Sequence, residues 1–423
     1  MALERHPRAL EQRERRHELD ALKGQAIATA LPKISAHAST LRSRNPGLLN
    51  SPNFASLAEG GGMGIDPSFL RPIPVTTYDY NIALEQTIYS FGRVGAAINT
   101  ARIREEQIAE EIRATEINIA RDAVVALYDL AVARAGLEVL ASERAALERQ
   151  LRQAQDFLDT GAGTRLQLLQ AQTALSALRP REISARGKVE LAQAALNEAL
   201  GLPSEQAVTP ATGLLEAEAL DELPSREALR AATGRRPDLL AMKIERRSLG
   251  EQSKVWRANT LPDLKLSGAF GISTIFTEEL TNQDFANWNI GVFFDWSFYD
   301  GRQTHHKLAE IRSQQIQNEY RERALRAQHE RELVSRITEY ERAREEAAAA
   351  RESVSTAEET LRVAEDSYRW GAATSLDILE AQQALTSARF QKLQAAHDAL
   401  VAFVRIRALA GLFPLDSFEE TKP

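Results

Sequence analysis

Hydrophobic and polar positions follow two different periods along this chain. From Thr77 onward, and twice more after Leu261, apolar side chains occur at every second position. Strict alternation of this kind predicts β-strands with one apolar and one polar face. The expected strands cover residues 33–43, 76–91, 263–275 and 286–299, and the first of them has the weakest pattern.

The apolar faces of these strands are rich in aromatic residues. They carry Tyr78, Tyr80, Ile82 and Leu84 in the first half of the chain, and Trp288, Ile290, Val292, Phe294 and Trp296 in the second. Strands of about 10–12 residues can cross a bilayer when tilted, and aromatic side chains favour the lipid interface. A soluble antiparallel sandwich would alternate in the same way. However, four strands are too few for a closed barrel and leave open edges, so association of several chains is expected.

Between the strands the period changes to that of long helices. Residues 94–160 and 303–369 contain no proline and are rich in Ala, Leu, Glu, Arg and Gln, which predicts one helix of roughly 100 Å in each range. Apolar residues spaced three, four or seven apart indicate a coiled-coil seam. A glycine-containing turn and a returning helix follow each long helix, so each half predicts an antiparallel helical hairpin. Pro180 should bend the first returning helix, whereas the second has Phe390 at the equivalent place.

The two halves are copies of one unit. The segment Gly161–Gln172 reappears as Gly371–Gln382, at an offset of 210 residues, and Gly201-Leu202 reappears as Gly411-Leu412. Several matches in the same order indicate a duplication. The others are Tyr89–Arg93 with Phe298–Arg302, and Leu31-Pro32 with Leu261-Pro262. The expected division is a first repeat at 1–203, truncated at its N-terminus, a connecting equatorial segment at 204–232, a second repeat at 233–415 and a tail at 416–423.

Composition excludes several classes of function. The net charge is −7 and no basic block is present, which argues against a nucleic-acid partner. The chain has no cysteine, so neither a disulfide framework nor a thiolate metal site is expected. No apolar run is long enough for a transmembrane helix, and the first residues lack the apolar core of a signal peptide.

The sequence contains no catalytic pattern. The histidines do not form a zinc-binding pair on one helix turn, and neither a phosphate-binding loop nor a nucleophile elbow is present. The glycine-rich stretch Gly60–Gly64 lacks the lysine of a phosphate loop and is interpreted as part of a flexible surface loop at 44–74. We therefore expect no enzyme activity, no cofactor and no metal site.

Several stretches of the chain resemble the TolC-like outer-membrane efflux protein family (outer membrane factors). The resemblance rests on the strand-to-helix junctions Leu84–Arg93 and Phe294–Arg302, on Arg236–Leu239, and on the second hairpin tip, Tyr368–Gly371 with Asp377–Ala381. It implies a mainly α fold with a membrane β-barrel. Three chains would each give four strands to a twelve-stranded β-barrel, and their coiled-coil hairpins would form a trimeric α-barrel.

The resemblance also implies a function and a location. The chain would be a passive trimeric exit duct of a tripartite efflux or type I secretion system, in the outer membrane of a Gram-negative bacterium and spanning into the periplasm. Its expected partners are two further copies, outer-membrane lipid, a periplasmic adaptor (a membrane fusion protein) and an inner-membrane pump of the resistance-nodulation-division or ABC type. The family's signal peptide and first helix have no counterpart ahead of Pro7, so we expect the sequence to begin inside a longer protein.

The resemblance assigns roles at the two hairpin tips. Asp377 and Glu380 lie three residues apart on one helix face and would form acidic rings at a channel gate. The other expected gate residues are Tyr368, Arg369, Gln167 and Gln170. The adaptor would dock at the small residues of the turns, Gly161, Gly163, Thr164, Gly371 and Thr374.

Alternative interpretations stay open at this stage. Asp377 and Glu380 could be ordinary solvated helix residues, and the turn glycines could serve turn geometry alone. A soluble coiled-coil scaffold or adaptor would also explain the long hairpins. The aromatic stripe of Trp288, Trp296 and Phe298 argues against that scaffold, because soluble proteins rarely expose such a surface.

Overall fold

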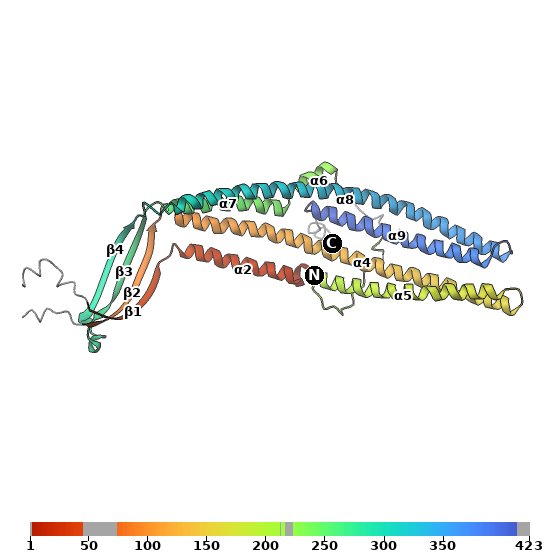
Figure 1. Cartoon of the computed structure of the whole chain (residues 1–423), viewed down its shortest axis with the longest axis horizontal. Helices are drawn as coiled ribbons and strands as arrows, with labels where there is room; N and C mark the ends of the chain where they lie inside the picture. The colour runs from red at the N-terminus through yellow and green to blue at the C-terminus, as the bar shows by residue number, and fades with distance from the viewer. Residues whose placement is uncertain (1, 45–73, 212, 216–222, 413–423) are drawn as a thin grey trace, which may run out of the picture. The chain divides into compact units, whose positions relative to one another are not determined.

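The computed structural model describes residues 2–44, 74–211, 213–215 and 223–412 (Figure 1). The expected loop at 44–74, including Gly60–Gly64, lies almost wholly outside these residues, as do part of the connecting segment and the tail at 416–423. The chain divides into two compact units, which are described separately. The first contains Met1–Glu18, Glu105–Arg246 and Gln317–Pro423, and the second contains Leu19–Arg104 and Arg247–Ile316.

Helices and strands alternate along the chain in the expected order. The elements are α1 (Ala2–Arg5), α2 (Pro7–Ala28), β1 (Lys33–Ser43), β2 (Val75–Tyr89), α4 (Arg93–Asp159), α5 (Arg165–Leu200), α6 (Arg226–Thr233), α7 (Pro237–Ala258), β3 (Asp263–Thr274), the short 3-10 helices η3 (Thr277–Glu279) and η4 (Gln283–Phe285), β4 (Ala286–Asp295), α8 (Gln303–Arg369) and α9 (Ser375–Leu409). Helix α5 continues through Pro180 without a break.

The second unit contains a four-stranded antiparallel sheet in the order β1-β2-β3-β4. Strand β2 approaches β3 so closely at Gly271 that a Cβ atom there would collide with the carbonyl oxygen of Tyr80. Strands β1 and β4 form the two edges of the sheet. The outer side of each has no partner strand among the described residues.

Three expected strands end earlier than the alternation suggests, and β3 does so by one residue, at Thr274 rather than residue 275. Strand β2 ends at Tyr89 rather than residue 91, and β4 ends at Asp295 rather than residue 299, so Trp296 lies outside β4. The end of β4 follows from pairing, because Asp295 faces Asp263, the first residue of β3. Pro262 precedes Asp263 and has no N–H to continue the ladder. The indole nitrogen of Trp296 instead donates to the carbonyl oxygen of Thr260 at 3.1 Å.

The sheet meets the long helices at two junctions with the same local conformation. Phe91 and Arg302 have positive φ angles of 48° and 69°, and each adjoins a glycine with positive φ. Such pairs of left-handed residues reverse the chain sharply before a helix begins. The helix start is capped by the Ser90 hydroxyl in one junction and by the Asp300 carboxylate in the other.

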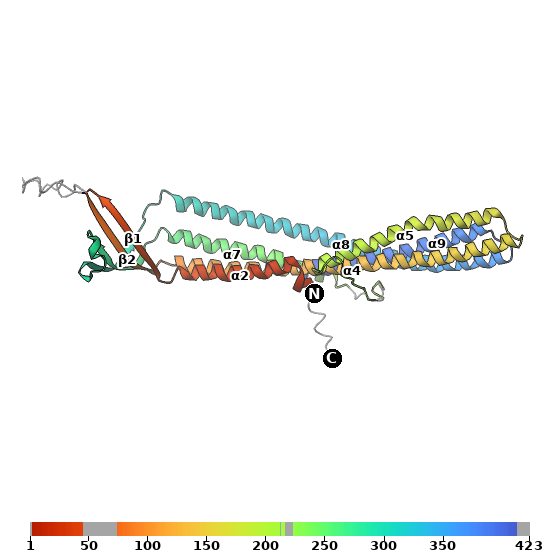
Figure 2. The ribbon, with the colours of Figure 1, turned by 90° about the horizontal axis from the view of Figure 1, so that it is seen from below.

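The first unit is built from the two helical hairpins (Figure 2). Leu130 of α4 and Leu196 of α5 share one buried cluster, while Ile406 of α9 shares another with Leu333 of α8. A third cluster joins the hairpins, because Leu140 and Leu178 pack with Phe390 of α9. Between these clusters alanine dominates the interfaces, which lets the helices approach closely.

Both hairpin turns adopt the same geometry at the offset of the repeat. Gly161 and Gly371 have φ angles of 76° and 74°, which glycine adopts without strain. Ala162 donates to the Phe157 carbonyl and Ala372 to the Ser367 carbonyl, both at 2.8 Å, as in a Schellman helix end.

Candidate functional site

The first candidate surface is the two-faced sheet. The strand register aligns side chains of similar polarity across all four strands. One apolar row consists of Ala36, Ile82, Phe270 and Trp288. The neighbouring row on the same face consists of Ile34, Leu84, Gly268 and Ile290. The opposite face carries polar rows, such as His37, Asn81, Gly271 and Asn287.

The apolar face of the sheet is uncovered in the single chain. Trp288 is 73% exposed and Ile290 is 69% exposed, and Ile82 and Phe294 are similarly open. Among the other residues expected on this face, Tyr80 and Val292 are exposed, whereas Tyr78 and Leu84 are partly buried. Trp296 is also exposed although it lies beyond the strand. A contiguous apolar surface of this kind marks contact with another protein or with lipid.

The second candidate surface is the tip of the second hairpin. The Asp377 carboxylate accepts hydrogen bonds from the backbone N–H and the hydroxyl of Thr374, and Thr374 caps the Asp377 N–H in return. These bonds lower the pKa of Asp377 below its ordinary value. The first hairpin has the same capping box with Thr164 and the uncharged Gln167. Asp377 therefore already has a structural function, which the sequence analysis missed although the Thr-x-x-Asp spacing is typical of a capping box.

Other expected gate residues lie near this tip. Glu380 is exposed one turn into α9, and Gln170 is partly buried at the matching place in α5. Arg369 forms an ion pair with Asp366 at 3.3 Å. The Tyr368 ring lies 6.2 Å from the Phe157 ring, measured between centroids, and burial raises the pKa of the Tyr368 phenol. The Phe157–Tyr368 contact joins α4 and α8 beside the turns, which no local sequence signal predicted.

The small residues of the turns have distinct structural functions. Gly161 and Gly371 provide the positive φ angles, and Thr164 and Thr374 cap the returning helices. At Gly163 an added Cβ atom would lie 2.9 Å from the Phe157 Cβ, so only glycine fits without a local shift. The structure thus accounts for these residues as turn-forming, and adaptor docking remains a proposal.

A partly buried ionic cluster explains the Arg236–Leu239 motif. The Arg236 guanidinium and the His329 ring both contact the Asp238 carboxylate, at 2.8 and 3.2 Å. Burial alone would raise the pKa of Asp238, but the hydrogen bonds from His329 and Arg236 outweigh it and lower that pKa. Arg236 also donates to the carbonyl oxygen of Leu409 at the end of α9. The motif therefore joins α7, α8 and α9.

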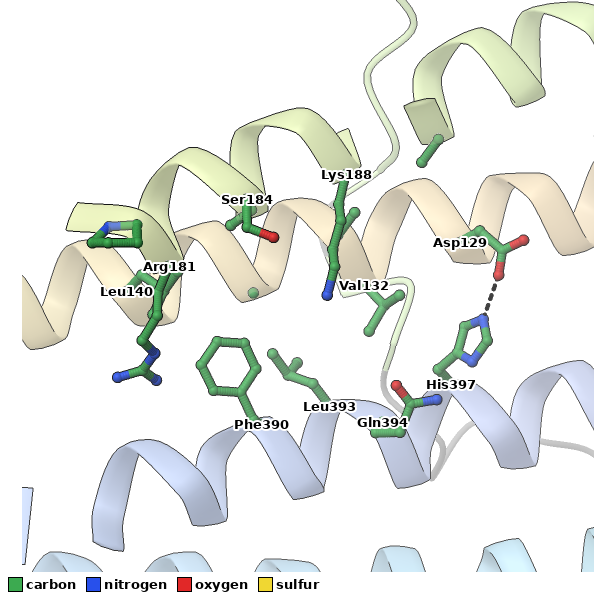
Figure 3. Close-up of a pocket in the computed structure, with 15 residues that line it drawn as sticks. Asp129, Val132, Leu140, Arg181, Ser184, Lys188, Phe390, Leu393, Gln394 and His397 are labelled. Atoms are coloured by element: carbon green, nitrogen blue, oxygen red, sulfur yellow. Dashed lines mark hydrogen bonds and ion pairs between the residues drawn. The ribbon is translucent and has the colours of Figure 1, made fainter. Parts of the chain in front are cut away.

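A second polar cluster joins the two hairpins. The His397 Nε2 atom lies 2.6 Å from Asp129 of α4 (Figure 3). The Nδ1 atom of the same ring lies 3.1 Å from Asp398. Burial alone would lower the pKa of His397, but hydrogen bonds to the two carboxylates outweigh it and raise that pKa. Sequence reasoning missed this contact, because Asp129 and His397 lie far apart in the chain.

The described residues contain no cluster of three or more His, Cys, Asp or Glu side chains that could hold a metal ion. Within the same residues, no helix has an apolar stretch of the length that a bilayer span requires.

Comparison with known proteins identifies a family and relatives that this chain resembles. Residues 1–202 and 228–412 match the family model described as "Outer membrane efflux protein". The chain is 27% identical to the outer membrane efflux protein BepC of Brucella suis over 81% of this chain and 74% of that protein. It is 23% identical to the alkaline protease secretion protein AprF of Pseudomonas aeruginosa, over 79% and 70% of the two chains.

Solved structures give the same result for the fold. The crystal structure of the outer membrane protein VceC from Vibrio cholerae matches with a TM-score of 0.74 and 18% identity, over 98% of this chain and 95% of that chain. The resemblance to TolC-like proteins is therefore confirmed. Members of the matched family are transport channels, which confirms that the chain is not an enzyme and favours an outer-membrane exit channel over a soluble scaffold. The family model spans nearly the whole chain, and the chain belongs to the outer membrane efflux protein family.

Proposed function

We propose that three copies of this chain form a passive exit duct through the outer membrane. The observation that carries the proposal is the four-stranded sheet, with one exposed apolar face and two edges that have no partner strand in the part of the chain that the structure describes. In lipid every backbone polar group needs a partner, so a membrane sheet must close on itself. Four strands from each of three copies close into a twelve-stranded barrel, with β4 of one copy pairing with β1 of the next. The side chains in the apolar rows of the sheet then face the lipid.

The helical hairpins form the periplasmic part of the duct. Their α4–α5 and α8–α9 tips are the proposed docking points of a periplasmic adaptor, around Gly161, Gly163 and Thr164 in one hairpin and Gly371 and Thr374 in the other. An inner-membrane pump of the resistance-nodulation-division or ABC type supplies the energy. The proposed cargo is a small molecule or a secreted protein; among the relatives, BepC is named an efflux protein and AprF an alkaline protease secretion protein.

The gate lies at the second hairpin tip. In a trimer, three copies each of Asp377 and Glu380 surround the axis and favour cations at the constriction. The exposure of both side chains supports this role, and the Phe157–Tyr368 contact supports Tyr368 as a latch between the hairpins. Arg369 forms an ion pair with Asp366 beside the acidic second tip. Gln167 and Gln170 are the uncharged counterparts of Asp377 and Glu380 at the first tip.

The assembly is tested by its mass and location. The chain is expressed with an outer-membrane export signal ahead of Met1, extracted from the membrane fraction in detergent, and weighed by light scattering corrected for bound detergent. The proposal expects a mass three times the 46.9 kDa of the chain, with the protein in the outer-membrane fraction. A folded monomer or dimer would overturn the trimeric barrel.

A further inference from the structure

A cavity of about 660 Å³ lies between α4, α5 and α9, within the unit that contains the hairpins (Figure 3). This volume is typical of a site for a small organic molecule. Its apolar walls are formed by Val132 and Leu140 of α4 and by Phe390 and Leu393 of α9. None of these residues belongs to the tips or the sheet.

The cavity lies where the two repeats differ in sequence. Pro180 of α5 and Phe390 of α9 occupy equivalent repeat positions, and both line it. Gly136 of α4 leaves room for the Phe390 ring, because an added Cβ atom there would lie 3.2 Å from the ring. The Phe390 ring therefore forms a flat wall of the cavity. The facing helix, α5, has Pro180 at the equivalent repeat position instead of a bulky residue.

The charged groups around the cavity favour an anion. Asp129 is the sole carboxylate among its lining residues, and its oxygen is engaged by His397 at 2.6 Å. Arg181 is paired with Glu143 at 3.0 Å. Lys188 has no ion pair among the residues that the structure describes, and Figure 3 shows its side chain directed from α5 toward α9 across the cavity. Lys188 is solvent-exposed, so its ammonium group can form a charge-assisted hydrogen bond with the acidic group of a molecule that lies against the apolar walls.

We propose that this cavity binds a small amphipathic organic anion. The flat apolar body of the ligand lies against Phe390 and Leu393, and its single acidic group pairs with Lys188. A cationic ligand would find no uncommitted carboxylate among the lining residues. A neutral one would gain no charge-assisted hydrogen bond from the Lys188 ammonium group.

The absence of cysteine in the chain allows a direct test. Ser184 lines the cavity and is exposed, so Ser184→Cys places one thiol at the site without disturbing the core. The rate of its modification by iodoacetamide is measured on the purified, assembled full chain, with and without naphthalene-2-sulfonate. A probe concentration four times the Kd should slow modification by about five-fold, because only the empty site reacts. Ser355→Cys, an exposed position on α8 outside the cavity, is the matched control and should react at an unchanged rate.

Two further variants separate the acidic group from the apolar body. Adding Lys188→Gln to Ser184→Cys should abolish most of the protection, and the uncharged naphthalene-2-sulfonamide should protect far less than the sulfonate. Protection by both probes alike, or protection that survives Lys188→Gln, would overturn the assignment of an anion. No protection at Ser184→Cys, equal protection at Ser355→Cys, or a Ser184→Cys thiol that does not react in the assembled protein would overturn the site itself.

Discussion

The Asp377 carboxylate accepts hydrogen bonds from the backbone N–H and the hydroxyl of Thr374, at 2.6 and 2.8 Å. In the first hairpin, Thr164 and Gln167 make the same capping box with a neutral amide. The start of the returning helix therefore needs an oxygen acceptor three residues after the threonine, but it does not need a charge. The charge of Asp377 is the property that a gate can use.

Replacing both acids of the second tip with glutamine should remove cation selectivity but keep the capping box at the start of α9. The double variant Asp377→Gln/Glu380→Gln copies the first hairpin and is expected to shift the reversal potential in a KCl gradient toward zero, because six carboxylates leave the trimeric constriction. The melting temperature should stay the same. Thr374→Ala, which removes the cap, should instead destabilise the fold by about 1 kcal/mol. The control is Glu352→Gln, an exposed acid on α8. Cation selectivity equal to that of the parent protein in the double variant would refute the acidic gate.

When Glu380 is replaced and Asp377 is the only acid left at the gate, cation selectivity should persist at acid pH. Hydrogen bonds from the Thr374 N–H and hydroxyl lower the pKa of Asp377, so its carboxylate stays charged as pH falls through the ordinary range of aspartate. The single variant Glu380→Gln should therefore keep most of its cation preference at about pH 4. The same measurement on Glu380→Gln/Thr374→Val, which removes the hydroxyl, should show the preference fading at a higher pH. Identical pH profiles for the two variants would contradict this account.

The contact between the hairpins at His397 should weaken in mildly alkaline solution. Hydrogen bonds to Asp129 and Asp398 raise the pKa of His397 despite its burial. A raised pKa means that the contribution to stability is fully present below about pH 6.5, the value for the unfolded chain, and is lost as pH rises through the folded-state pKa. Melting temperatures measured from pH 6 to 9 should fall more steeply for the parent protein than for His397→Gln. Asp129→Asn should flatten the profile as well, and parallel profiles for all three proteins would exclude the linkage.

Two glycines of β3 should respond differently to a methyl group. At Gly271 a Cβ atom would collide with the Tyr80 carbonyl oxygen of the neighbouring strand, whereas at Gly268 the nearest atom would lie at 3.5 Å, an ordinary contact. Gly271→Ala should therefore separate β2 from β3 and remove most of the assembled protein from the outer membrane. Gly268→Ala, in the same strand, is the matched control and should assemble normally. Equal yields from extracted membranes would show that the close approach at Gly271 does not matter for assembly.

Edge pairing between copies can be detected with introduced cysteines. Pairs are placed on the polar face of the two edge strands, at Ser35, His37 or Ser39 of β1 and at Asn287, Asn289 or Gly291 of β4. Within one chain β2 and β3 lie between these edges, so the paired positions are about 14 Å apart and beyond the reach of a disulfide. At least one pair should give covalent dimers and trimers on a denaturing gel after oxidation. Single-cysteine variants should give no trimer, and failure of every pair would count against edge-to-edge closure.

The sequence by itself determined the elements whose signals are local. Alternation over Trp288–Phe294 predicted a strand, and the absence of proline over residues 303–369 predicted a helix that the structure shows at Gln303–Arg369. The turns at Gly161 and Gly371 were also predictable, because a glycine between two helical patterns supplies the positive φ angle that ends a helix. Family motifs in the sequence were sufficient to indicate the outer membrane efflux protein family.

Only the tertiary structure decided the features that depend on distant residues. Strand β4 ends at Asp295 because its partner begins after Pro262, whereas alternation alone continued to residue 299. Phe157 meets Tyr368, and Asp129 meets His397, because the packing of the hairpins brings these positions together. Hydrophobic period and turn residues determine how each segment folds, since these act over a few neighbouring residues. Register and contacts between helices depend on the shapes of both partners, and no single stretch of sequence contains that information.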